Sequence, residues 1–141
     1  MAIKLTNSRR DLTRMVAEGL EVFKQRTIRT LAYVGEQCIN DGRLKGSYMD
    51  RTGNLRSSIG YAIVDDGQIV QMSMNPKTLN GEEGLKEGET YLHRLAREHS
   101  TGLVLIVVAG MKYAAYVEAR GYNVISSAEL LAEKLIPQLV K

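Results

Sequence analysis

The sequence has little of what marks secreted and disulfide-stabilised proteins. Among its 141 residues there are one cysteine, two prolines, one phenylalanine and no tryptophan. Because Cys38 has no possible partner within the chain, a disulfide scaffold is excluded, and the single cysteine fits either a reducing cytoplasm or simply a thiol packed in the core. The first ten residues also lack the apolar core of a signal peptide, so we expect a protein that is made and kept in the cytoplasm.

Long apolar runs are missing as well. The longest, Leu103–Met111, has nine residues, whereas a membrane-spanning helix needs about 20. We therefore expect no membrane partner.

Residue patterns typical of catalytic and metal sites are also scarce. His93 and His99 are six residues apart, and no spacing of histidine and cysteine matches a zinc motif. No serine lies in a G-x-S-x-G turn, and the glutamates of the segment GEEGLKEG would repel a phosphate. The sequence thus predicts no metal, no cofactor and no enzyme activity.

What the chain does contain is typical of a globular domain. Hydrophobic residues make up 44% of it and charged residues 25%, which is enough apolar material for one core. We expect a single domain over residues 1–141.

The first 42 residues predict one long helix. Apolar and small residues recur at steps of three and four, which places them on one helical face: Leu12, Val16, Leu20, Phe23, Thr27, Leu31, Val34 and Cys38. Such a helix is about 50 Å long, whereas a compact domain of this size is somewhat under about 40 Å across. The helix must bend at Gly19 or Gly35, or extend past its domain and bury its free end against another subunit.

The remaining chain predicts short alternating elements. We expect a capped turn at 52–58 with Thr52 as the cap, and a flexible acidic, glycine-rich loop at 75–90. Strands are predicted at 59–64, 68–74, 103–109 and 122–125, the first two joined by an Asp-Gly turn and the third central. Helices are predicted at 89–99, 113–119 and from Ser126 onward. The fold class is α+β, with a long N-terminal helix, a mostly antiparallel sheet of about four strands, and shorter helices packed on it.

The charge is distributed unevenly. Residues 1–56 hold 11 Lys and Arg against 6 Asp and Glu, whereas residues 57–141 hold 8 against 10. A small nucleic-acid-binding module that uses the Arg-rich N-terminal half is therefore an alternative function. Acidic residues interleave along the first helix, so any such binding is expected to be weak and non-specific.

Two motifs concentrate special residues. The first, RTGNLRSSI, contains Arg51, Thr52, Gly53, Leu55, Arg56 and Ser58. The second, KYAAYVEARG, places Tyr113, Tyr116 and Val117 at i, i+3 and i+4 as an aromatic face, followed by Glu118 and Gly121. We expect the two motifs to be neighbours, with Glu118 near Arg51 or Arg56, and the aromatic face to serve self-association.

Together the two motifs, preceded by the long helix, resemble the tail-completion or head–tail joining family of long-tailed bacteriophages. The matching positions are Thr52, Gly53, Leu55, Ser58 and Ile59 in the first motif, and Tyr113, Ala114, Tyr116, Val117, Glu118 and Gly121 in the second. The resemblance implies a non-catalytic virion protein, made in a bacterial host, that forms a ring, commonly hexameric. Its expected partners are copies of itself and phage connector and tail proteins at the tail or neck.

Overall fold

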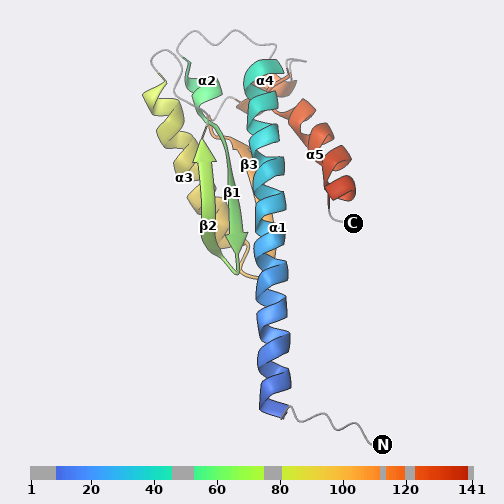
Figure 1. The fold of residues 1–141 in the computed structure, drawn as a ribbon. Coiled ribbons are helices and arrows are strands. Elements are labelled where there is room, and N and C mark those ends of the chain that lie inside the picture. Colours follow the sequence, from blue (N-terminus) through green and yellow to red (C-terminus); the bar gives the residue numbers. More distant parts are fainter. Residues whose placement is uncertain (1–8, 46–52, 75–80, 112–113, 120–122, 140–141) are drawn as a thin grey trace, which may run out of the picture.

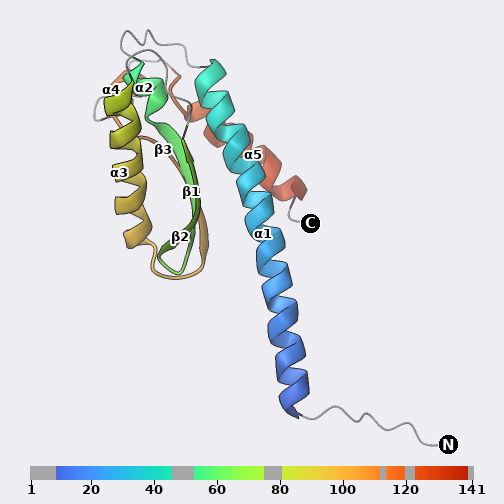
Figure 2. The same cartoon turned by 60° about the vertical axis from the view of Figure 1, so that its left-hand side comes forward.

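The computed structural model describes residues 9–45, 53–74, 81–111, 114–119 and 123–139. They form an α+β fold in which helices cover both faces of a three-stranded antiparallel sheet (Figures 1 and 2). The elements are α1 (Arg9–Lys45), α2 (Asn54–Ser57), β1 (Ile59–Asp65), β2 (Gln68–Met74), α3 (Glu82–Glu98), β3 (Leu103–Ala109), α4 (Ala114–Ala119) and α5 (Ser126–Leu139).

The hairpin between β1 and β2 is confirmed. Asp66 and Gly67 occupy its two central positions with φ values of 49° and 85°. Positive φ at both positions matches the twist of antiparallel strands, and Asp-Gly tolerates it. Asp66 also joins the turn to the start of β3, since its carboxylate accepts a hydrogen bond from the Gly102 N–H at 2.7 Å.

The strand order is β2-β1-β3, which corrects two predictions. β3 is an edge strand rather than the central one, because β1 pairs with both neighbours. The fourth strand is also wrong, since the described residues 123–125 lie in no strand. Val124 is instead buried among Leu55 and Ala114, and its N–H donates to the Glu118 carboxylate at 2.5 Å, so it does not join a strand ladder.

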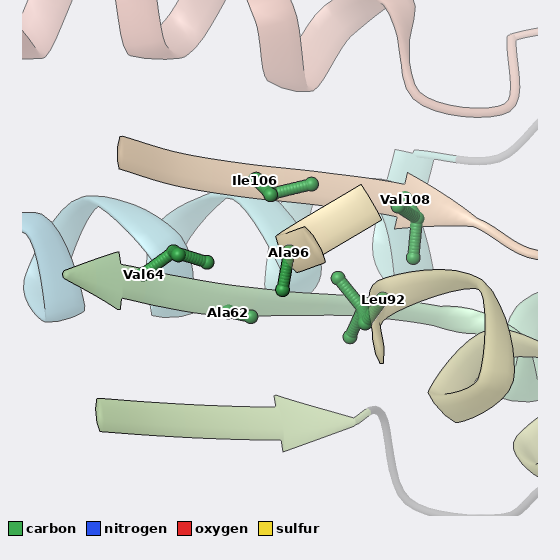
Figure 3. Close-up of a cluster of buried hydrophobic side chains, with 6 residues drawn as sticks. All are labelled: Ala62, Val64, Leu92, Ala96, Ile106 and Val108. Carbon is green, nitrogen blue, oxygen red and sulfur yellow. The ribbon is translucent and has the colours of Figure 1, made fainter. Parts of the chain in front are cut away.

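The alternating side chains of β1 build two apolar layers. On one face, Ala62 and Val64 pack with Leu92 and Ala96 of α3 and with β3 (Figure 3). On the other face, Ile59, Tyr61 and Ile63 meet α1 around Ile39. Because both faces are covered, the core residues of β1 are completely buried.

Tyr61 fixes how closely α1 approaches the sheet. A Cβ atom added at Gly35 would lie 2.6 Å from Cδ2 of the Tyr61 ring, so the glycine is what lets the ring lie against the helix. The hydroxyl of Tyr61 donates to Glu36 and accepts from Gln71, each at 3.1 Å. Gly35 therefore serves packing and does not interrupt the helix, which is continuous from Arg9 to Lys45.

The segment predicted as a flexible loop at 75–90 is largely a helix. Residues 75–80 lie outside the described residues, but α3 begins at Glu82. Its glycines pack closely: a Cβ at Gly84 would overlap the Asn54 carbonyl, and one at Gly88 would lie 2.5 Å from the Ser58 oxygen. The glycines of this segment predicted a mobile loop. In the structure their lack of a Cβ atom lets the backbone of α3 lie directly on the backbone at Asn54 and Ser58.

Two glycines of α1 give opposite predictions for stability. Gly35→Ala should lower the free energy of unfolding by about 1–3 kcal/mol, because the new methyl group overlaps the Tyr61 ring. Gly19→Ala should leave it unchanged or raise it by up to about 1 kcal/mol, because nothing lies within 4 Å of that site and alanine favours helix. Urea unfolding of the two variants compares them. Equal effects would mean that Gly35 is not a packing glycine.

Candidate functional site

The first motif is a buried junction. Gly53 is the N-cap of α2 with a left-handed φ of 77°, which corrects the prediction that Thr52 caps this turn. Thr52 and Arg51 lie outside the described residues. Leu55 and Ser58 are buried and Arg56 is half-buried. Most of the described motif is therefore buried in the interior of the fold.

This junction joins three elements through backbone contacts. The N–H of Gly84 in α3 donates to the Asn54 side chain at 3.0 Å. The Gly110 N–H, just after β3, donates to the Ser58 carbonyl at 3.1 Å. The Ser58 hydroxyl donates to the Leu55 carbonyl at 2.6 Å. We infer that the motif fixes the ends of α3, β1 and β3 relative to one another.

The second motif lies beside the first, as predicted. Ala114 of α4 is buried in one cluster with Leu55 and Val124. Tyr113 and Gly121 lie outside the described residues, as do the side chains of Tyr116 and Val117, so the aromatic face stays a prediction. Glu118 accepts a hydrogen bond from the Val124 N–H, a role that the sequence did not predict. It holds the chain in position immediately before α5.

Among the described residues, most of the exposed large hydrophobic side chains lie in the N-terminal part of α1. The helix extends well past the sheet, as Figures 1 and 2 both show. Where α1 begins to extend past the sheet, the ammonium of Lys24 forms a salt bridge with Asp65 at the end of β1. The hydrogen bond within this ion pair raises the pKa of Lys24. We call residues 9–23 the free half of α1. Of the two predicted solutions, bending or extending past the domain, the helix adopts the second.

The free half carries an apolar stripe on one side. Its members are six large residues that are 52–67% exposed: Leu12, Met15, Val16, Leu20, Val22 and Phe23. They recur at helical spacing, while Arg14 pairs with Asp11 and Glu18 away from the stripe. Contiguous exposed apolar patches often mark interaction sites, whereas single exposed apolar residues are common on any protein surface.

A second apolar surface is a groove between α5 and β3, which we call the α5–β3 groove. Its volume is about 400 Å³. Its apolar lining comes from α1, β3 and α5, and three glutamates complete it: Cys38, Leu105, Val107, Ile125, Ala128, Ala132, Ile136, Glu118, Glu129 and Glu133. Glu129 and Glu133 are exposed. The groove brings together elements distant in sequence, so no local pattern could have predicted it.

Within the described ranges, the structure holds no group of three or more metal-ligating side chains. No helix among the described residues is long and apolar enough to cross a membrane. Comparisons of the chain with protein-family models, with curated proteins and with solved structures found no match. Two surfaces of the described residues are the candidate functional surfaces: the free half of α1 and the α5–β3 groove.

Cys38 gives a prediction about reactivity. Cys38 is 1% exposed, its thiol donates weakly to the Ala128 carbonyl at 3.5 Å, and burial, with a smaller contribution from Asp41, raises the pKa of this thiol above its ordinary value. Because the thiolate is the reactive form, a thiol reagent at pH 8 should label native protein at least tenfold more slowly than protein in denaturant. Equally fast labelling would show that the thiol is accessible.

The same pKa shift has a consequence for stability. At alkaline pH, above the ordinary pKa of a cysteine, the folded state retains a proton that the unfolded state loses, so the free energy of unfolding should fall as the pH rises. Cys38→Ala should reduce this decline in pH-dependent urea unfolding. An identical pH dependence in the variant would contradict the assignment.

Proposed function

We propose that this chain is a non-catalytic structural protein of a phage or prophage virion. It acts in head–tail joining or tail completion, by assembling with copies of itself into a ring that docks on connector and tail proteins. The observation that carries the proposal is the apolar stripe on the free half of α1, with Phe23 67% exposed. The likeness of the two motifs to the tail-completion family supports it.

Exposure of the free half of α1 is energetically unfavourable for an isolated subunit. A helix of about 15 residues is marginal in water when it lacks tertiary contacts, and it persists here as a continuation of the packed half of α1. Burial of its stripe would recover roughly 25 cal/mol per Å² of apolar surface. In an assembling protein the exposed segment has a function, because a neighbouring copy supplies the tertiary contacts that the apolar stripe lacks in the isolated chain.

The buried junction supports the same function indirectly. Hydrogen bonds from Gly84 to Asn54 and from Gly110 to Ser58 hold α3 and the end of β3 to this junction, while α1 and α5 form a separate layer on the other face. A rigid core is what a ring subunit needs, because small rotations at each contact accumulate around the ring. The motif residues thus maintain the shape of the subunit.

Nucleic-acid binding is the alternative, since Arg9, Arg10 and Arg29 are exposed on α1. Phosphates would pair with such arginines, but they would not bury the six apolar side chains of the stripe. Binding to DNA measured between 50 and 200 mM salt would favour this alternative if it stayed sub-micromolar with a sequence preference at the upper salt concentration.

Self-association should depend on the stripe. Phe23→Glu places a carboxylate on it, and we expect the apparent dissociation constant between subunits to rise at least tenfold. Gln25→Glu is the matched control: it adds the same charge two residues away, outside the stripe, and should have little effect. Sedimentation velocity over a range of protein concentrations measures both, and circular dichroism verifies the fold.

Two outcomes would contradict the proposal. The wild-type protein could stay monomeric at all concentrations and in the presence of virion proteins, or Gln25→Glu could weaken association as strongly as Phe23→Glu. The place in the virion is tested separately, by detecting the protein in the tail or neck of purified particles. Its absence from particles would overturn the virion role even if the protein forms rings.

A further inference from the structure

We propose that the α5–β3 groove is the acceptor for the free half of α1 from a second copy of this chain. The inference rests on the proposed self-assembly and names the contact through which it occurs. Each subunit then contributes two different surfaces: its free half of α1 binds one neighbour, and its α5–β3 groove receives the free half of another.

The groove fits the stripe in size. A dry cavity of about 150 Å³ holds one benzene ring, so a groove of about 400 Å³ has room for two or three large apolar side chains. Val16, Leu20 and Phe23 present such side chains at steps of four and three, on one side of the helix. Seating an amphipathic helix in an apolar groove is a common mode of peptide recognition.

The charges of the two surfaces are opposite. The described lining of the groove includes three glutamates and no lysine or arginine. The first turns of α1, residues 9–14, hold three arginines and one aspartate, and the helix N-terminus adds a positive partial charge. Arginines that flank the stripe would therefore meet glutamates that flank the groove.

Parallel pairing of two free halves is disfavoured by the same charges. Residues 9–14 carry a net positive charge, and a parallel pair would align like with like. An antiparallel pair would instead place residues 9–14 of one helix against residues 18–23 of the other, which hold Glu18 and Glu21. The groove variant described below separates such a helix pair from the groove contact, because it leaves the free half of α1 unchanged.

The free half does not reach the groove of its own subunit. Cys38 of the same helix already lines that groove, and Phe23 lies 15 residues earlier, about 22 Å along the axis. Since α1 is continuous through this stretch, its free half leads away from the groove. A second copy must provide the occupant, and a contact between two different surfaces closes into a ring when its rotation permits.

Mixing two complementary variants tests the contact. The helix variant, Leu20→Glu with Phe23→Glu, retains an intact groove. The groove variant, Glu129→Lys with Glu133→Lys, retains an intact helix. Each alone should associate at least tenfold more weakly than the wild type, whereas a 1:1 mixture should form a two-subunit complex through the one remaining functional contact. Sedimentation velocity and native mass spectrometry measure the complex.

The control is Glu83→Lys with Glu98→Lys, which makes the same charge change at exposed positions of α3 and should associate like the wild type. Thermal unfolding verifies that all variants fold. If the groove variant associates like the wild type while the helix variant does not, the groove is not the acceptor, although self-assembly through α1 stands. If the wild type never associates, both the proposed function and this contact fall.

Discussion

The mismatch in length between α1 and the sheet is the constraint on which the rest of the structure depends. A seven-residue strand spans about 23 Å, whereas the 37 residues of α1 span about 55 Å. The sheet and α5 cover the part of the helix that holds Val34, Cys38 and Ile39. The other part extends beyond the sheet from Lys24 with its apolar residues exposed, and in the proposed assembly a second copy of the chain buries them.

Close packing at glycine determines how the described helices lie against the sheet. Gly35 admits the ring of Tyr61 against α1, while Gly84 and Gly88 let α3 lie on the backbone at Asn54 and Ser58. These contacts hold the two helical layers at fixed distances from the sheet. The α5–β3 groove is a consequence of this architecture: α5 packs on α1 through Ala128, and the space beside β3 is left open to solvent.

Apolar periodicity in the sequence was sufficient to predict α1, and the Asp-Gly turn was sufficient to predict the hairpin. The length of α1 left open whether the helix bends at Gly19 or Gly35 or extends past the domain, and the structure shows a continuous helix. Local sequence patterns failed where tertiary context decides. The run Leu103–Ala109 reads as a strand, but no local signal says whether one strand or two lie beside it. Gly84 and Gly88 suggested a loop because their packing role depends on Asn54 and Ser58, which are 30 residues earlier. The groove draws on α1, β3, α4 and α5, so only the folded chain reveals it.

Amide hydrogen exchange at increasing protein concentration tests the central claim most directly. In dilute protein, residues 9–23 should exchange quickly because their helix lacks tertiary contacts, while β1 is protected. As subunits associate, the account predicts that protection rises at residues 9–23 and across α5 together, over one concentration range, with β1 unchanged. Protection of residues 9–23 that does not depend on concentration, or that rises without any change in α5, would contradict it.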